Sequence, residues 1–303
     1  MSAQAYDGRG GRSPEWWPSR YGAGDERGAQ NELGSEGALR ALAIPRQGRT
    51  IALAQPLRTE VAQTPPRIAH QVTLAHLAVH GGPDPDGSGV TAFEDQLTIS
   101  SHAGCHVDGL GHCGIGGRGY NGVPTTELYD PSGLTWLGVE GVDPWVTRGV
   151  LLDVAALHGV ATLPADHAIG AAELERAAAA AGIEVAAGDA VLVNTGWGAL
   201  WDADPEGYAA GEPGVDWEGA HWLTERRVSA VGADNWGFEP IPGFGEGAFV
   251  VHQHLLTETG TFIVENLTLA ELVAAGASEF LFLMAPLRIV GLTGSPVAPV
   301  AVI

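Results

Sequence analysis

Apolar, strand-like segments alternate with helix-forming segments in the second half of this chain, and this order restricts the possible folds more than any other feature. Residues 149–154 (GVLLDV) and 190–194 (AVLVN) are short apolar runs that predict buried strands. Between them, residues 171–181 (AAELERAAAAA) are rich in alanine and are followed by Gly182, which predicts a helix closed by a glycine. Because no fixed-period repeat is present, the alternation predicts one mixed α/β domain in which helices cover a sheet.

The rest of the chain extends this pattern. Thr268 and Glu271 have the spacing of a capping box at the start of a helix. The first 35 residues are rich in Gly, Arg, Ser and Pro, so we expect an irregular N-terminal arm over 1–35 and the folded domain over 36–303. The remaining predicted elements are strands at 50–54, 72–79, 91–100, 228–231 and 280–289, and helices at 217–227 and 268–276.

Composition excludes several classes of protein. The 303 residues are 45% hydrophobic, which suits a folded chain rather than a disordered one. The formal net charge of −21 argues against binding to nucleic acid or to an anionic membrane surface, so a small molecule is the expected partner. No apolar run approaches the roughly 20 residues of a membrane span, and the N-terminus has no apolar signal region. We therefore expect a cytoplasmic protein.

The segment 101–113 (SHAGCHVDGLGHC) contains the residues most suited to chemistry. His102, His106, Asp108 and His112 are separated by even numbers of residues, so on an extended chain their side chains would share one face. On a helix Asp108 would point away from His102, and the glycines at 104, 109 and 111 also disfavour a helix. The spacing therefore predicts a strand that runs into a loop.

A flat strand would place His102 and His106 roughly 13 Å apart, which is too far for two ligands of one ion. We therefore expect the backbone to curl near Gly104. Two imidazoles and one carboxylate, from His102, His106 and Asp108, form a common ligand set for Zn²⁺, Mn²⁺ or Fe²⁺ that leaves coordination positions open. The alternative is a chance cluster of polar loop residues.

His112 lies beyond two glycines and can reach the same cavity without binding the same ion. An unligated histidine at such a site is suited to proton transfer near neutral pH. The alternative is a supporting or surface histidine with no part in the chemistry.

A second polar segment runs from His252 to Asn266. His252 and His254 would share a face of a strand. Glu265 is framed by Phe262, Ile263, Val264 and Leu267, where an unpaired carboxylate is costly, so it either lies beside a cation or forms an ion pair with an arginine such as Arg226.

Two further groups of residues have weaker signals. Tyr120, Trp197 and Trp236 are candidates for an aromatic-lined substrate pocket, although each could equally fill the core. Cys105 and Cys113 have no CxxC pairing, and we interpret both as buried structural thiols.

The first motif resembles the HxGTHxDxxxH signature of the cyclase family of metal-dependent hydrolases, which includes kynurenine formamidases and isatin hydrolases. Three other segments also resemble family patterns. Cys105 stands where the family usually has threonine, and residues 109–111 (GLG) lack the proline common in formamidases. The matching residues are His102-x-Gly104-x-His106-x-Asp108-x-x-x-His112, Tyr21-Gly22-x-x-Asp25-x-x-Gly28-x-x-Asn31, Gly188-Asp189 with Thr195-Gly196-Trp197, and His252-Gln253 with Gly260 and Ile263-Val264-Glu265-Asn266.

The resemblance implies a role for each matched residue. His102, His106 and Asp108 match the first metal ligands, and His112 matches the catalytic histidine. His252 and Glu265 match residues that bind a second metal ion in some members and act as active-site polar groups in others. The resemblance also implies a mixed-sheet, swivelling β/β/α-type fold and assembly as a homodimer or homotetramer.

The expected activity is hydrolysis of an amide or ester carbonyl by metal-activated water, with one or two Zn²⁺ or Mn²⁺ ions as cofactor. We expect the substrate to be a cyclic amide, a lactone, or an N-formyl or aryl amide, with His112 and Glu265 as catalytic groups. Two alternatives stay open: a cupin-type metal oxygenase that uses His252, His254 and Glu258, and a non-catalytic binding protein stabilised by metal.

Overall fold

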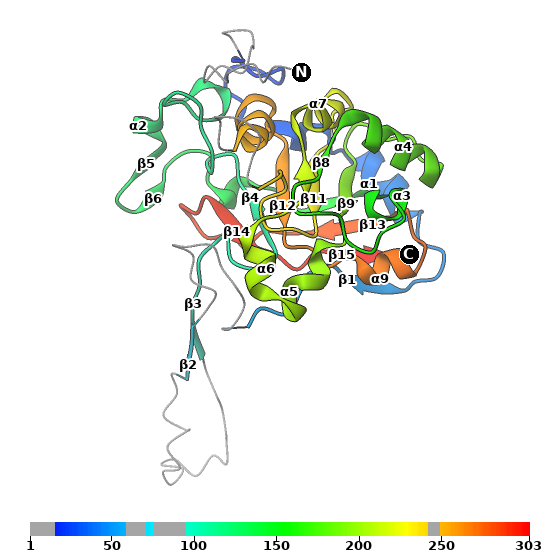
Figure 1. Cartoon of the computed structure of the whole chain (residues 1–303). Coiled ribbons are helices and arrows are strands. Elements are labelled where there is room, and N and C mark those ends of the chain that lie inside the picture. Colours follow the sequence, from blue (N-terminus) through cyan, green and yellow to red (C-terminus); the bar gives the residue numbers. More distant parts are fainter. Residues whose placement is uncertain (1–15, 59–70, 75–94, 242–248) are drawn as a thin grey trace, which may run out of the picture.

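A mixed sheet of nine strands crosses the centre of the part of the chain described by the computed structural model, residues 16–58, 71–74, 95–241 and 249–303 (Figure 1). The strand order is β1-β15-β13-β7-β9-β11-β12-β4-β14. These strands are β1 (Thr50–Ala52), β4 (His106–Asp108), β7 (Trp145–Asp153), β9 (Ala190–Asn194), β11 (Ala230–Ala233), β12 (Phe262–Glu265), β13 (Glu279–Met284), β14 (Gly294–Pro296) and β15 (Val300–Val302).

Three small sheets and a set of short helices complete the described fold. The small sheets pair β2 (Gln71–Leu74) with β3 (Asp95–Thr98), β5 (Tyr129–Asp130) with β6 (Gly133–Leu134), and β8 (Ala168–Ile169) with β10 (Gly214–Val215). The helices are α1 (Ser35–Leu42), α2 (Thr125–Leu128), α3 (Val154–Leu157), α4 (Ala171–Ala181), α5 (Leu200–Ala203), α6 (Pro205–Ala210), α7 (Trp217–Glu225), α8 (Val250–His252) and α9 (Ala270–Ala274). The other helical segments are the 3-10 helices η1 (Gly28–Glu32), η3 (Tyr120–Gly122), η4 (Val139–Gly141) and η5 (Trp197–Ala199), and the π-helix η6 (Gln253–Thr259).

The centre of the sheet is parallel and its flanks are antiparallel. Strands β7, β9, β11 and β12 run parallel, whereas β13, β15 and β1 on one side and β4 and β14 on the other pair antiparallel. Every residue of β9, β11 and β12 is buried, which explains why these strands are apolar except at Asn194 and Glu265, because a central parallel strand is covered on both faces. The predicted mixed α/β fold is confirmed.

Helices pack on the sheet as the alternation predicted. Helix α4 packs against α7 and β7, and α1 packs against β7 and β13. Figure 1 shows α4 and α7 above the large sheet and α5, α6 and α9 below it. Gly182 adopts the left-handed conformation at φ 67° and caps α4, as predicted. The predicted helix at 217–227 is confirmed as α7, which ends at Glu225.

Some predicted boundaries were wrong. The capping box at Thr268 does not form, because α9 begins at Ala270 and the backbone N–H of Thr268 instead bonds to the carbonyl of Leu53. Glu271 pairs with Arg49 at 2.7 Å. The strand expected at 280–289 ends at Met284, shortly before a proline that cannot donate to a ladder.

The other predicted strands differ mainly in length. Strand β11 begins two residues later than expected, and β1 ends at Ala52. The strands expected at 72–79 and 91–100 are confirmed as β2 over 72–74 and as β3 over 95–98. Residues 99–100 lie beyond the end of β3, and 75–79 and 91–94 lie outside the described part of the chain.

The described part of the N-terminal arm packs on the folded body. The hydroxyl of Tyr120 donates to Asp25 at 2.6 Å, and Nδ2 of Asn121 donates to the carbonyl of Gly22 at 2.8 Å. The backbone N–H of Ala29 donates to the carbonyl of Gly260 at 2.8 Å. The first two contacts join the arm to η3, and the third joins it to the segment between η6 and β12. The boundary at residue 35 stays a prediction.

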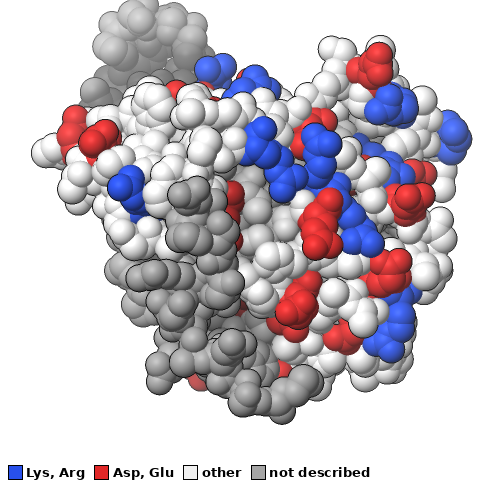
Figure 2. All heavy atoms as spheres, turned by 90° about the horizontal axis from the view of Figure 1, so that it is seen from above, with Lys and Arg blue, Asp and Glu red and all other residues white. Residues whose placement is uncertain are grey.

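Among the residues that the structure describes, no helix combines the length and apolar character needed to cross a bilayer. Figure 2 shows arginine side chains interspersed with aspartate and glutamate on the face seen from above. Ion pairs among the described residues include Arg227 with Glu32 and Arg226 with Glu175. The same face therefore carries both signs of charge side by side.

Candidate metal centre

Strand pairing places two acids and a histidine next to one another. Strand β4 lies between β12 and β14, and its register with β12 sets His106 opposite Glu265. Residues opposite each other in an antiparallel pair share a face, as do residues two apart on one strand, so His106, Glu265 and Asp108 meet on one side of the sheet. Nε2 of His106 lies 3.1 Å from Oε2 of Glu265 and 3.5 Å from Oδ1 of Asp108. The strand predicted for His106 and Asp108 is confirmed.

A turn brings His102 back to the same face. Gly104 has a φ of 63°, a left-handed conformation that glycine adopts without strain, and its carbonyl contacts Nδ1 of His106 at 2.7 Å. The predicted curl near Gly104 is thus confirmed. Nδ1 of His102 lies 2.7 Å from Oδ1 of Asp108, and its Nε2 lies 2.8 Å from the hydroxyl of Thr293. Sequence reasoning missed Thr293, which follows β13 and precedes β14.

The prediction that His252 and His254 share a strand face was wrong. His252 ends helix α8 and His254 lies in η6, so residues two apart point in nearly opposite directions. Nε2 of His252 lies 3.1 Å from Oε1 of Glu265 and 3.6 Å from Oδ2 of Asp108. His254 instead contacts Thr224 and Glu258 and stacks on His221.

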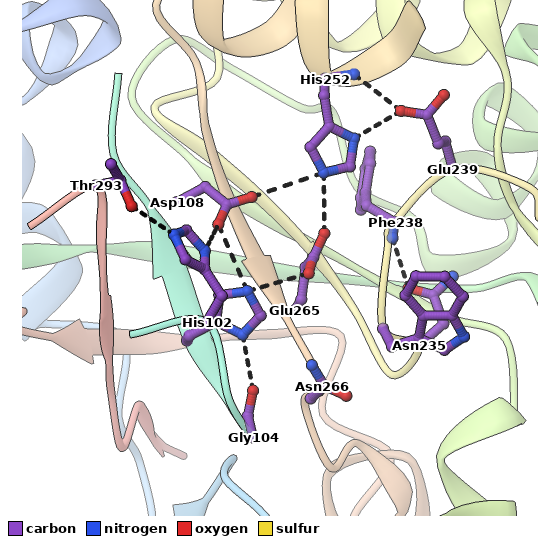
Figure 3. A network of polar contacts seen from close by, with 12 residues as sticks. His102, Gly104, Asp108, Asn235, Phe238, Glu239, His252, Glu265, Asn266 and Thr293 are labelled. Atoms are coloured by element: carbon purple, nitrogen blue, oxygen red, sulfur yellow. Dashed lines mark hydrogen bonds and ion pairs between the residues drawn. The ribbon is translucent and has the colours of Figure 1, made fainter. Parts of the chain in front are cut away.

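Two overlapping groups of ligand atoms result, and Asp108 belongs to both (Figure 3). One group is His102, His106 and Asp108, and the other is Asp108, His252 and Glu265. Within each group the ligand atoms lie within 4.8 Å of one another. Figure 3 shows the side chains of His102, Asp108, His252 and Glu265 pointing toward a common centre from different segments of the chain.

The residues fit a divalent cation. Nε2 of His106, Oδ2 of Asp108 and Oε2 of Glu265 are buried, and each lacks a hydrogen-bond partner among the described residues. Buried polar atoms without a hydrogen bond are costly in a folded protein, and the three atoms here have only ion-pair contacts within the centre, between residues whose side chains converge. Imidazole nitrogens and carboxylate oxygens are the ligands that Zn²⁺ and Mn²⁺ commonly use. A cation at this point would satisfy all three atoms.

Electrostatic interactions within the centre favour charged groups despite their burial. Burial alone would lower the pKa of His106, but the carboxylates of Asp108 and Glu265 outweigh it and raise that pKa to about 9. Burial and the charge of Asp108 raise the pKa of Glu265, but His106 and His252 outweigh both and lower it to about 2. Burial likewise raises the pKa of Asp108, and the surrounding imidazoles hold it well below its ordinary value. Both carboxylates are therefore ionised.

His112 lies beside the centre and belongs to neither ligand group. The centroid of its ring is 4.0 Å from that of His102 and 6.4 Å from that of His252. Burial, with the charges of the neighbouring imidazoles, outweighs the attraction of Asp108 and lowers the pKa of His112 to about 4. The imidazole is thus neutral at pH 7, the form that can accept a proton.

Glu239 is a residue of the centre that sequence reasoning did not identify. Its Oε1 lies 2.6 Å from Nδ1 of His252 and accepts the backbone N–H of the same residue at 3.0 Å (Figure 3). Glu239 is only 3% exposed, so its carboxylate needs such partners. The available signal was the segment 234–239 (DNWGFE), which follows a predicted strand and combines two acids with two aromatic residues.

Two of the three aromatic candidates lie together. Trp197 and Trp236 belong to a cluster with Trp201, Tyr208, Leu57 and Leu200. Leu57 lies against Gly104, 3.1 Å from the position of a Cβ there, and the hydroxyl of Tyr208 donates to Asn266, the residue after Glu265. This cluster therefore borders the metal centre. Tyr120 is separate, because it is fully buried against the arm and Gly260.

The remaining alternatives are resolved by the same contacts. The ion pair proposed between Glu265 and Arg226 was wrong, because Arg226 pairs with Glu175 at 2.9 Å. The cupin alternative requires His252, His254 and Glu258 to bind one ion. His254 instead contacts Glu258, whereas His252 faces Glu265 and Asp108. Cys105 is buried in the core, and Cys113 is half-buried.

Comparisons with known proteins agree with this geometry. The family model named Cyclase matches residues 51–240. A crystal structure described as a novel cyclase is 29% identical, covers 94% of this chain and 98% of its own, and superposes with a TM-score of 0.86. No curated protein matches the chain.

Two further structures show likeness of fold. Isatin hydrolase A from Ralstonia solanacearum is 22% identical, with a TM-score of 0.63, and covers 89% of this chain and 97% of its own. A predicted metal-dependent hydrolase from Bacillus stearothermophilus is 18% identical, with a TM-score of 0.53, and covers 84% of this chain and 97% of its own. The match over well more than half of the sequence, on a shared fold, shows that this chain belongs to the cyclase family.

Proposed function

We propose that this protein is a metal-dependent hydrolase that adds water to an amide or ester carbonyl. The observation that carries the proposal is the convergence of His106, Asp108 and Glu265, each with a buried polar atom that has no hydrogen-bond partner among the described residues. Related folds described as isatin hydrolase and metal-dependent hydrolase support the same activity. The proposed substrate class is a cyclic amide or lactone, or an N-formyl or aryl amide.

His102, His106 and Asp108 would hold one Zn²⁺ or Mn²⁺ ion, and Asp108, His252 and Glu265 would hold a second. When bound, such an ion supplies Lewis acidity toward water and toward the carbonyl of the substrate. Because Asp108 belongs to both ligand groups, its replacement would affect both.

The other residues act on protons and on the position of the substrate. The neutral imidazole of His112 accepts a proton from the attacking water and returns it to the leaving amine or alkoxide, because its lowered pKa keeps the base form available. Glu265, held ionised by His106 and His252, is the second proposed catalytic group. The cluster with Trp197 and Trp236 provides an apolar wall for a ring or aryl group, and restricts water beside the reacting carbonyl.

The test compares His112→Ala with Asp108→Ala. The purified proteins are assayed by elemental analysis and then on a panel of lactone, lactam and N-formyl amide substrates, with and without a chelator. His112→Ala should retain metal and lose most turnover, by about 10²–10⁴-fold, whereas Asp108→Ala should lose both. His221→Ala, which removes a histidine outside the centre, is the control. Turnover of His112→Ala at the wild-type rate would refute the assignment of the base.

The same panel distinguishes the non-catalytic alternative. A metal-stabilised binding protein would gain thermal stability with added metal, would turn over no member of the panel, and would show no perturbation of the site by small anions. Cytoplasmic location and assembly as a homodimer or homotetramer stay predictions.

A further inference from the structure

A second cluster of metal-ligating side chains lies outside the candidate metal centre. His158 follows helix α3, His167 precedes strand β8, and Glu173 lies in the first turn of α4. Nε2 of His158 lies 2.5 Å from Oε1 of Glu173, and Nε2 of His167 lies 2.9 Å from the same oxygen. Three segments of the chain thus place three potential ligand atoms within 4.8 Å of one another.

The two imidazoles approach in a geometry suited to a shared ion. Their ring centroids lie 4.8 Å apart and their planes are inclined at 74°, so the rings do not stack, and both Nε2 atoms face the same carboxylate oxygen. A tetrahedral ion with bonds of about 2.0–2.1 Å separates its ligand atoms by about 3.3 Å. Binding an ion would therefore move Nε2 of His158 and Nε2 of His167 away from the carboxylate oxygen by about 0.8 Å and about 0.4 Å, starting from 2.5 Å and 2.9 Å.

The cluster is accessible to solvent, and its surroundings attract cations. The side chains of His158, His167 and Glu173 are 34%, 23% and 16% exposed, so an ion could enter and water could fill a remaining coordination position. The other carboxylate oxygen of Glu173 accepts the backbone N–H of Gly170 at 3.2 Å, which holds the side chain in place. A chain with a net charge of −21 also raises the local concentration of cations.

We propose that His158, His167 and Glu173 form a divalent transition-metal site that is independent of the candidate metal centre. Imidazole ligands favour Zn²⁺, Ni²⁺ or Cu²⁺ over Mg²⁺ or Ca²⁺, and Zn²⁺ is the ion to which we commit. The bound ion joins the end of α3 and the segment before β8 to the start of α4. The competing arrangement is purely structural, with both histidines donating hydrogen bonds to a helix-capping glutamate.

The experiment titrates Zn²⁺ into metal-free full-length protein in the Asp108→Ala background, in which both ligand groups of the candidate metal centre lack their shared residue. Stoichiometry and affinity are measured by competition with a chromophoric chelator. One Zn²⁺ ion should bind, and His167→Ala and Glu173→Gln should each weaken that binding by at least about tenfold. Glu175→Gln, which removes the same charge two residues along α4, should leave it unchanged.

A measurement on the wild-type protein keeps the proposal testable if a variant fails to fold. The ¹⁵N resonances of the His158 and His167 imidazoles should shift together when Zn²⁺ is added, because both Nε2 atoms become ligands. Absence of binding at millimolar Zn²⁺ in the Asp108→Ala background would overturn the proposal. The proposal would also be overturned if His167→Ala in this background bound Zn²⁺ as tightly as the Asp108→Ala protein does.

Discussion

Glu239 and His252 form a buried pair in which Oε1 of the carboxylate lies 2.6 Å from Nδ1 of the imidazole. Oε1 of Glu239 also accepts the backbone N–H of His252 at 3.0 Å, so this oxygen acts as an acceptor and Nδ1 of the imidazole as its donor, while the other ring nitrogen faces Glu265 and Asp108. Burial lowers the pKa of His252, but Glu239 and Glu265 outweigh it and raise that pKa well above its ordinary value. We therefore propose Glu239 as a positioning residue, which fixes the orientation of the His252 imidazole through these contacts.

Replacement Glu239→Gln should weaken metal binding by about 10–100-fold, because the amide no longer enforces one tautomer of His252. Metal affinity is measured by chelator competition on the purified protein. Glu258→Gln is the matched control, because Glu258 makes the same kind of contact to Nδ1 of His254, at 2.8 Å, outside the centre. Equal affinities of the two variants would show that the Glu239 contact is only structural.

Thr293 has the corresponding role toward His102. Its hydroxyl lies 2.8 Å from Nε2 of that histidine, whose Nδ1 faces Asp108. Thr293→Val keeps the shape of the side chain and removes the hydroxyl, so metal content after dialysis should fall by about tenfold or more. Thr293→Ser restores the hydroxyl and should restore the metal content. Loss of metal in both variants would indicate that packing, rather than the hydrogen bond, positions His102.

The local sequence pattern was sufficient to predict the backbone of one part of the candidate metal centre, residues 102–108. Alternation along 102–108 and the glycine at 104 predicted both the strand and the curl, because side-chain parity and left-handed glycine are properties of neighbouring residues. The strand at 190–194 was predictable as β9, because a strand buried on both faces is mainly apolar. The prediction at 149–154 located β7, but that strand begins at Trp145 and ends at Asp153, and Val154 begins α3.

The positions of the other residues of the centre depend on contacts between distant segments. His106 faces Glu265 because of the register between β4 and β12, which no local pattern specifies. His252 and His254 lie at the junction of α8 and the π-helix η6, where alternation suggested a strand. Glu239 could not be placed because its partner, 13 residues away, is reached only after the chain folds back.

Glu212 gives a prediction for the pH dependence of stability. It is fully buried, and burial raises its pKa well above the ordinary value of a glutamate. A group whose pKa is raised by folding contributes stability below its unfolded pKa, and this contribution is lost as the pH rises through the folded value. The neutral replacement Glu212→Gln removes this pH-dependent contribution to the free energy of unfolding.

The free energy of unfolding, measured by urea denaturation between acidic and neutral pH, should therefore decline less with rising pH in Glu212→Gln than in the wild type. Glu218→Gln removes an exposed charge on α7 and serves as the control. Parallel curves for the wild type and Glu212→Gln would contradict the assignment of a neutral carboxyl at position 212.

Gly28 links the N-terminal arm to the metal centre. Its φ of 53° is left-handed, and a Cβ at this position would lie 2.3 Å from the carbonyl oxygen of Gly260. Gly260 separates the helical segment that carries His252 from the strand that carries Glu265. Any displacement of Gly260 therefore changes the spacing of two proposed ligands.

Replacement Gly28→Ala should lower the free energy of unfolding by about 1–3 kcal/mol, through backbone strain and the clash with Gly260. It should also reduce metal affinity, because the spacing of His252 and Glu265 depends on the same contact. Gly24→Ala is the matched control in the same arm, since no atom lies within 4 Å of a Cβ at that position. Urea denaturation and chelator competition measure the two effects. If Gly28→Ala were as stable as Gly24→Ala and bound metal equally well, the arm would have no part in shaping the centre.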